Sequence, residues 1–465
     1  MKWAPFSRAK PPAAKGVDAQ HRNGSAARRG LTHMQLKLRT ILGAAALVAA
    51  APLLSAVPKG DEPIAVPTSI RQGIDFVYVD PQMSSVAQRH QKPRNWLSRM
   101  FRGAPEATRS APNPLFAQLS DGLQAYRQRW GALPQTRIPA GPALKAGSKD
   151  KRVALLRTRL GLAPAGGYDS ELGAAVAAYQ QVHGLAPADG IAGRATLVSL
   201  NLGADYFEKR IAINMERAYR LPQTQTFERY VVIDSGSANA WLFSGDRLAD
   251  TMPVVVGSAK TKTPIMAVLM HDAKVHPYWN VPPDLIRSLT AARIKQQGLK
   301  YLSDFHYEVL ANWSEGAPVI DPHTVDWKLI AAGGGPEVRV RQLPGPWNSM
   351  GEMKFEMPND FGIYLHDSPH KDLFAVPERH LSNGCVRLSD YRRFASWVFG
   401  RIPQASTPRE QEFALPRPVP VYMTYLTVAP GEGGLVFRPD VYGLDALAMP
   451  QMEFGAPGRL AAAGV

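Results

Sequence analysis

The chain of 465 residues contains a single cysteine, Cys385, in the segment 381–388. A histidine, His366, ends the short apolar run 363–366 nineteen positions earlier. A thiolate is a strong nucleophile, but a free thiol is mostly protonated at neutral pH. A histidine within hydrogen-bond reach can take that proton, and such a pair transfers acyl groups. If the fold brings them together, these two residues predict nucleophilic chemistry.

The neighbours of the cysteine suit the same chemistry. Gly384 lets the backbone approach a substrate closely, and N–H groups around Gly384 and Cys385 could stabilise a developing oxyanion. Arg387 lies one strand period beyond Cys385 and so on the same face. Its guanidinium could lower the thiol pKa or bind a substrate carboxylate with its planar fork. Tyr364 shares the face of His366 and could either shape the pocket or pack in the core.

Taken alone, this pattern leaves other interpretations open. A lone cysteine is often a small buried hydrophobe, and it cannot form an intramolecular disulfide. A zinc site could have the ligands His366, His370, His380 and Cys385, but the spacing of these residues fits no common zinc finger. We therefore predict no metal site.

The run 364–388, with its Ser-Asn-Gly-Cys-Val-Arg core at 382–387, resembles the catalytic motif of the YkuD-type L,D-transpeptidases. That family has a histidine somewhat under twenty residues before a Ser-His-Gly-Cys-x-Arg element. The flanks 275–283 and 342–348 resemble the long Gram-negative members, which carry an inserted capping subdomain. The resemblance covers about residues 115–425. Asn383 replaces the usual histidine of the motif, so the role of base falls on His366.

The resemblance implies a role for each residue of the motif. Cys385 would be the nucleophile, His366 the general base and acid, and Gly384 part of the oxyanion hole. The substrate-binding residues would be Arg387, Tyr364, Ser382, Asn383, Trp279 and Trp347. For the two tryptophans, stacking on sugar or peptide competes with ordinary aromatic packing.

The reaction implied by the resemblance is a 3→3 cross-link between peptidoglycan stem peptides. The cysteine would be acylated by a tetrapeptide with release of D-alanine, and an amine of a second stem would resolve the thioester. Such a site would need no cofactor and would be acylated by carbapenems. The alternatives are the same acyl-enzyme used for carboxypeptidase activity, lipoprotein attachment or D-amino acid exchange, and a non-catalytic wall-binding scaffold. Other wall-synthesis enzymes are conceivable partners.

The pattern of helices and strands expected around these residues predicts a multidomain α+β fold. Three short helices over 148–203, with Asp-Gly-x-x-Gly-x-x-Thr at 189–196, resemble a peptidoglycan-binding domain. From residue 229 the apolar period changes from 3.6 to 2, which predicts a mostly-β catalytic domain over 229–428 with a helical capping insertion at 284–349. The flanking segments are a lead-in, helical scaffold and linker at 57–147, a helical connection at 204–228, and a poorly ordered tail at 429–465.

The amino terminus has the pattern of an export signal. Lys37 and Arg39 precede an apolar stretch that ends near Leu54, which predicts a signal over 1–56 and a periplasmic protein, with an uncleaved inner-membrane anchor as the alternative. Met34 is a candidate true start. Nine basic residues and one acidic residue up to position 39 account for +8 of the formal net charge of +15. The remaining charge is spread thinly, which argues against nucleic acid and suits an anionic wall polymer.

Overall fold

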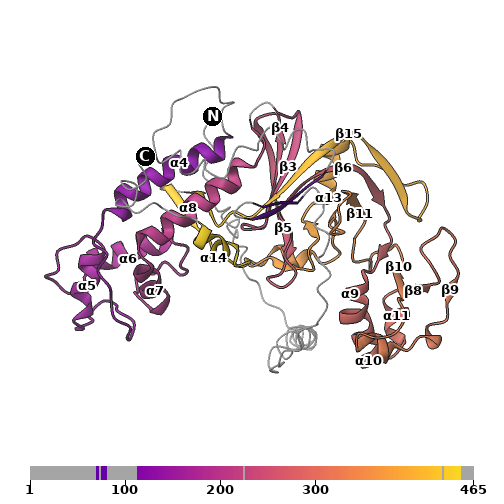
Figure 1. Ribbon diagram of the computed structural model, residues 1–465, viewed down its shortest axis with the longest axis horizontal. Helices are drawn as coiled ribbons and strands as arrows, with labels where there is room; N and C mark the ends of the chain where they lie inside the picture. Colours follow the sequence, from indigo (N-terminus) through magenta and orange to yellow (C-terminus); the bar gives the residue numbers. More distant parts are fainter. Residues whose placement is uncertain (1–69, 73–74, 81–112, 224–225, 432–433, 452–465) are drawn as a thin grey trace, which may run out of the picture. The chain divides into compact units, whose positions relative to one another are not determined.

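The computed structural model describes residues 70–72, 75–80, 113–223, 226–431 and 434–451, all within the compact unit Thr68–Val465 (Figure 1). The expected export segment 1–56, Met34 and the stretches 57–69 and 81–112 of the expected lead-in lie outside these residues, as does 452–465. None of the helices in the described ranges has the length and apolar character needed to cross a membrane.

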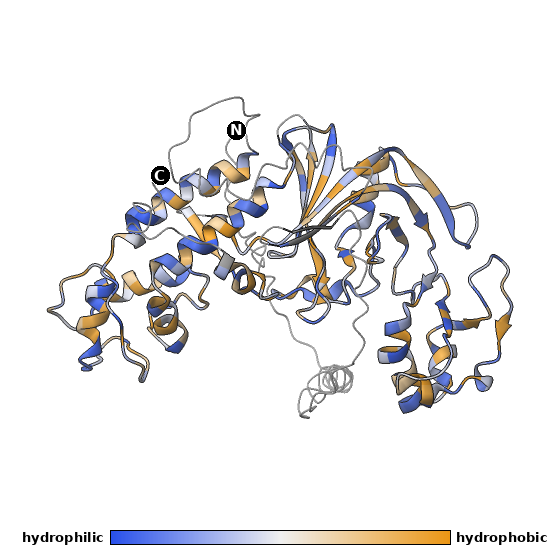
Figure 2. Ribbon diagram, in the orientation of Figure 1, coloured by the Kyte–Doolittle hydropathy of each residue, from blue (hydrophilic) through white to orange (hydrophobic). Residues whose placement is uncertain are grey.

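Two long helices, distant in sequence, pack against each other. Asn113 caps the first, because its side chain accepts a hydrogen bond from the Phe116 N–H at 3.0 Å. Apolar residues of both helices are buried in one core, which also takes up part of the sheet, and Figure 2 shows apolar and polar residues alternating along both. The helices are α4 (Pro114–Tyr126), extended by η2 (Arg127–Gly131), and α8 (Ala204–Tyr219).

The three helices expected within 148–203 are present. They are α5 (Arg152–Arg159), α6 (Ser170–Val182) and α7 (Arg194–Leu202). Asp169 caps α6 by accepting from the Leu172 N–H, and it also pairs with Arg157 at 2.8 Å. Leu156, Leu172 and other apolar residues of these helices are fully buried.

The region expected to be catalytic is built on one large sheet whose strand order closes on itself, because β6 pairs with both β11 and β15. In order across the sheet, the strands are β1 (Ile70–Gln72), β2 (Phe76–Val79), β6 (Met266–Val275), β11 (Met353–Glu356), β12 (Leu365–His366), β14 (Val386–Leu388), β5 (Arg247–Gly257), β4 (Asn239–Ser244), β3 (Arg229–Asp234) and β15 (Gln411–Thr424). The short strand β13 (His380–Ser382) pairs with β5, and α13 (Tyr391–Phe399) buries Phe394 in the core of the sheet.

The first two strands come from the segment expected to be a lead-in. Strand β2 pairs parallel with β6, with Tyr78 opposite Met266, and Tyr78 is buried in the core of the sheet. The sequence predicts a lead-in, helical scaffold and linker over 57–147, and in the structure 70–72 and 76–79 are strands of the large sheet. Tyr78 and Val79 of this short piece are buried, and they pair with Met266 and Ala267, nearly 190 residues away.

The expected capping insertion has its own sheet and its own core. The sheet has the order β7 (Trp279–Asn280), β10 (Arg339–Gln342), β8 (Tyr307–Leu310) and β9 (Val319–Ile320). The helical elements are α9 (Pro283–Leu285), η3 (Ile286–Ala291), α10 (Ala292–Gln297), α11 (Lys300–Asp304), η4 (Pro322–Thr324) and α12 (Trp327–Ala331). Val281, Ile286 and Val340 are among the residues of this separate core.

The expectation of a poorly ordered tail after residue 428 is wrong for the described residues to 451. They form β16 (Val428–Gly431), β17 (Gly434–Phe437), α14 (Leu444–Ala448) and the turn η6 (Met449–Gln451). Phe437 is buried between aromatic rings of the helical part, including His183 at 5.4 Å. The Gly- and Pro-rich composition suggested disorder, but buried Leu435, Phe437 and Tyr442 fix this segment to the fold.

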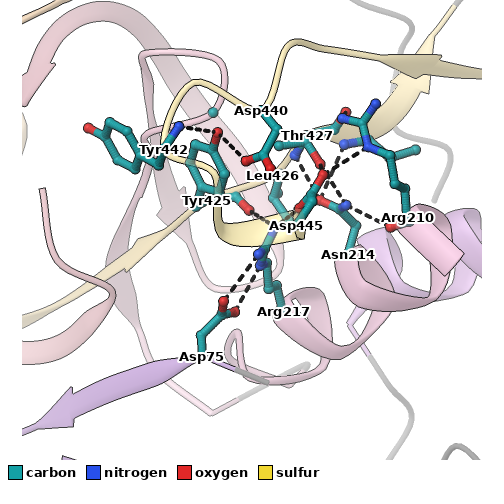
Figure 3. Close-up of polar contacts among 12 residues, drawn as sticks. Asp75, Arg210, Asn214, Arg217, Tyr425, Leu426, Thr427, Asp440, Tyr442 and Asp445 are labelled. Carbon is teal, nitrogen blue, oxygen red and sulfur yellow. Dashed lines mark hydrogen bonds and ion pairs between the residues drawn. The ribbon is translucent and has the colours of Figure 1, made fainter. Parts of the chain in front are cut away.

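A buried polar network ties this carboxy-terminal segment to α8 and to the first strands (Figure 3). The carboxylate of Asp445 pairs with Arg210 at 2.8 Å and with Arg217 at 2.6 Å. Arg217 also pairs with Asp75 at 2.8 Å, just before β2. Burial lowers the pKa of Arg217, but the carboxylates of Asp75 and Asp445 raise it by more, so the guanidinium stays charged. The network thus joins three segments that are distant in sequence.

The first prediction concerns this network. Asp445→Asn keeps the side-chain volume but leaves two buried arginines without their shared carboxylate. Breaking a buried pair in this way costs about 3–5 kcal/mol, so the urea midpoint followed by tryptophan fluorescence should fall clearly. Glu228→Gln, which removes the partner of exposed Arg417, should leave the midpoint nearly unchanged. Equal midpoints for the two variants would contradict the importance of the network.

Candidate active site

One register between neighbouring strands brings the candidate residues together. Strands β12 and β14 pair in parallel, with Leu365 opposite Val386 and His366 opposite Arg387. Leu365 and Val386 are fully buried in the core of the sheet. Because side chains alternate along a strand, His366 and Arg387 lie on the other face. Cys385, two positions before Arg387, is directed to that same face.

The neighbouring strand β11 adds two charged residues that the sequence analysis missed. Lys354 lies opposite His366 in the register, and its Nζ is 2.6 Å from Glu356 and 4.4 Å from the ring centroid of Tyr364. Only 12% of the Lys354 side chain is exposed. The alternation Met-Lys-Phe-Glu at 353–356 was a readable strand signal, but nothing in it pointed to the cysteine.

Ser382 and Gly384 shape the loop that carries the nucleophile. The Ser382 hydroxyl donates to the Cys385 carbonyl at 2.6 Å and accepts from the Gly384 N–H at 3.1 Å. Gly384 has φ +118°, and an added Cβ would lie 3.1 Å from Ile363, so the position requires glycine. The N–H of Gly384 is therefore already bonded within the loop. Within the described residues, the Cys385 N–H has no such acceptor.

The nucleophile and its candidate base are each held by a backbone carbonyl. The Cys385 thiol donates to the Gly362 carbonyl, with a sulfur–oxygen distance of 3.6 Å. Nδ1 of buried His366 lies 2.5 Å from the Asp367 carbonyl, which places the ring proton on Nδ1 and the lone pair on Nε2. Asp367 is itself fixed by the Glu352 N–H at 3.0 Å. The described contacts include no hydrogen bond between the thiol and the imidazole; such bonds often tighten only when substrate is present.

The electrostatics of the site favour a neutral pair. Burial, helped by the positive charge of Arg387, lowers the pKa of His366 to about 3. Burial raises the pKa of the Cys385 thiol, while contact with the backbone of Tyr364 and the cations Lys354 and Arg387 offset part of the rise. Thiol and imidazole are therefore both uncharged at neutral pH, and the charge must develop during reaction.

The remaining candidate residues occupy three different settings. Tyr364 adjoins the cysteine, and burial raises its pKa to about 12, so it stays protonated. Arg387 has a buried Nε without an acceptor in the described structure, and Asn383 is exposed at the edge of the loop. Trp279 lies in the capping unit and packs against the apolar core of that unit. Trp347 follows the last strand of the capping unit, is 40% exposed, and stacks on His306 with 3.6 Å between the ring centroids. No contact joins either tryptophan to Cys385.

Two parts of the chain match the models of known families. Residues 228–420 match the model of the YkuD family, described as the L,D-transpeptidase catalytic domain, and residues 156–200 match the family described as "Putative peptidoglycan binding domain". Both matches confirm the resemblances seen in the sequence. Every candidate residue from Trp279 to Arg387 lies inside the first match.

A Haemophilus influenzae protein named "Putative L,D-transpeptidase" is 29% identical over 245 residues, which cover 51% of this chain and 48% of that protein. The chain thus matches about half the length of this relative. Among solved structures, an L,D-transpeptidase from Mycobacterium smegmatis aligns with 14% identity, 42% and 58% coverage of the two chains and a TM-score of 0.21. One from Stackebrandtia nassauensis aligns with 14% identity, 62% and 96% coverage and a TM-score of 0.20. The likeness of residues 228–420 to this family rests on the sequence matches and not on these alignments.

The second prediction tests the charges around the thiol. Lys354→Met removes a cation that stabilises the thiolate, so the pKa of Cys385 rises further. Because a smaller fraction of the thiol is then ionised, iodoacetamide alkylation at pH 8 should slow by about three- to tenfold. Intact mass against time gives the rate. Lys300→Met, at an exposed position of the cap, should alkylate like the parent.

The pH profile of the parent protein gives a second readout. Because the pKa of His366 is about 3 instead of its ordinary 6.5, the imidazole does not titrate between pH 5 and 8. The alkylation rate should therefore rise smoothly toward alkaline pH. A step near pH 6.5, or equal rates for Lys354→Met and the parent, would contradict this electrostatic description.

Proposed function

We propose that this chain, whose residues 228–420 belong to the YkuD family of L,D-transpeptidase catalytic domains, forms 3→3 cross-links in peptidoglycan by cysteine acyl transfer. The observation that carries the proposal is the pairing of β12 with β14, which places His366 and Cys385 on one face of the sheet. The substrate is a tetrapeptide stem that ends in D-alanine, and the first product released is D-alanine.

The first step acylates the cysteine. Nε2 of His366 takes the thiol proton while Sγ attacks the carbonyl carbon of the third stem residue. The tetrahedral intermediate collapses by breaking the amide bond to D-alanine, whose amine takes the proton back from the imidazolium. A thioester between Cys385 and the stem remains. Since thiol and imidazole both start neutral, the ion pair forms only as the sulfur attacks.

The second step transfers the acyl group to an amine. A side-chain amine of a neighbouring stem attacks the thioester, its proton passes through His366 to the departing sulfur, and an amide cross-link forms. Water, a lipoprotein lysine or a free D-amino acid would resolve the same thioester to different products. Amines compete well for thioesters, which favours a stem amine as acceptor.

The charged groups of the site suit an anionic intermediate. The Cys385 N–H, which lacks an acceptor in the described structure, is the donor best placed for the oxyanion, since the Gly384 N–H is bonded to Ser382. Arg387 and Lys354 supply positive charge on the same face, which suits the terminal carboxylate of the donor stem.

The other domains would deliver and enclose the substrate. Residues 156–200 match a family of peptidoglycan-binding domains and would hold the chain on the wall. The capping unit would position the acceptor stem and exclude water. These roles require export, as the amino-terminal pattern predicts, and we propose that the protein works in the periplasm.

The third prediction is the reaction itself. Purified protein incubated with a disaccharide-tetrapeptide should give a dimer that is lighter than two monomers by one D-alanine, as mass spectrometry would show. Cys385→Ala should give none, since no thioester can form. His366→Gln should lower the rate by at least about 10²-fold, the usual contribution of a general base.

The products distinguish the acceptors and the scaffold alternative. If the protein with Cys385 formed a tripeptide product but no dimer, the activity would be that of a carboxypeptidase. An unchanged substrate together with no carbapenem adduct on Cys385 would contradict catalysis and support a wall-binding scaffold.

A further inference from the structure

The peptide unit between Gly384 and Cys385 is held from behind by a threonine. The Thr263 hydroxyl donates to the Gly384 carbonyl at 2.7 Å, and both residues are buried. This peptide bond is trans. In a planar trans peptide the carbonyl and the following N–H point in opposite directions. A hydroxyl that fixes the Gly384 carbonyl therefore also fixes the direction of the Cys385 N–H, which is the proposed oxyanion donor.

Thr263 is itself held on two sides. Its hydroxyl accepts from the Gly257 N–H at 2.9 Å, so its proton is directed to Gly384. Its backbone N–H donates to the Tyr442 hydroxyl at 3.3 Å. That hydroxyl in turn donates to the Gly257 carbonyl at 2.7 Å. Tyr442 therefore closes the turn 257–263 from the side opposite the nucleophile.

Tyr442 comes from the carboxy-terminal segment that the sequence predicted to be disordered. Its ring stacks on Tyr425 at 4.8 Å, and its N–H donates to the Tyr425 hydroxyl at 2.9 Å (Figure 3). Three residues later, Asp445 is fixed by Arg210 and Arg217. The segment is thus anchored by buried charges on one side and contacts the turn 257–263 on the other.

We propose that Thr263 and Tyr442 are positioning residues for acyl transfer: they orient the Cys385 N–H toward the oxyanion without touching the substrate. The inference rests on the proposed function, because it needs an acyl reaction with an oxyanion. Thr263 acts directly on the peptide that carries the donor. Tyr442 acts through Thr263 and the turn 257–263.

The fourth prediction separates positioning from simple structural support by comparing two reactions of the same thiol. Acylation by a carbapenem passes through an oxyanion, whereas alkylation by iodoacetamide is a displacement at carbon and does not. Thr263→Val has nearly the same shape but no hydroxyl, so its acylation should slow by about 10- to 100-fold, less than the 10²–10³ of a lost oxyanion donor. Its alkylation rate should equal that of the parent.

Two further variants complete the experiment. Thr263→Ser restores the hydroxyl and should recover most of the acylation rate. Tyr442→Phe keeps the stacked ring but loses both hydroxyl contacts, so its acylation should slow by a smaller factor, again without change in alkylation. With peptide substrate, both defects should appear in kcat and leave KM nearly unchanged.

Three outcomes would overturn the inference. Acylation of Thr263→Val at the parental rate would show that the hydroxyl does not position the donor. Equal slowing of acylation and alkylation in Thr263→Val would show general damage to the loop. If Thr263→Ser did not recover the acylation rate, the shape of the side chain and not its hydroxyl would set that rate. A parent protein that is alkylated but never acylated would contradict the proposed function itself, and this inference with it.

Discussion

The site depends on the parallel pairing of two very short strands. Leu365 against Val386 buries one face of β12 and β14 in the core, and this same register forces His366 and Arg387 onto the opposite face. A shift by one residue would reverse both faces and expose apolar side chains to water. The burial of the sheet therefore keeps His366 close to Cys385, the proposed base and nucleophile, which lie nineteen residues apart in the sequence.

Behind this pairing, the nucleophile loop is supported by parts of the chain far from the motif. Thr263 follows strand β5, Tyr442 lies beyond the last strand of the large sheet, and Asp445 is anchored on helix α8. Buried ion pairs contribute little net stability against apolar residues of the same size, but they tolerate few alternative arrangements. Here they give a defined position to a segment whose own strands and helices are short.

The sequence was informative where the signal is local or resembles a family. The Gly-Cys-x-Arg core, the preceding histidine and the three short helices could all be read directly, and the family matches confirm the two resemblances that these features carry. Contacts that depend on tertiary packing could not be predicted from the sequence. Lys354 reaches the site only through strand pairing, the Gly384 N–H is taken up by Ser382, and Tyr442 lies in a Gly- and Pro-rich stretch whose composition suggested disorder.

The central claim is that Cys385 attacks an acyl carbon whose oxygen is received by its own backbone N–H. A crystal structure of the protein acylated by a carbapenem tests this most directly. We predict a thioester to the sulfur of Cys385, with the acyl oxygen about 2.7–3.1 Å from the Cys385 nitrogen and His366 beside the sulfur. An adduct whose acyl oxygen points away from that nitrogen, or attachment to any other residue, would contradict the account.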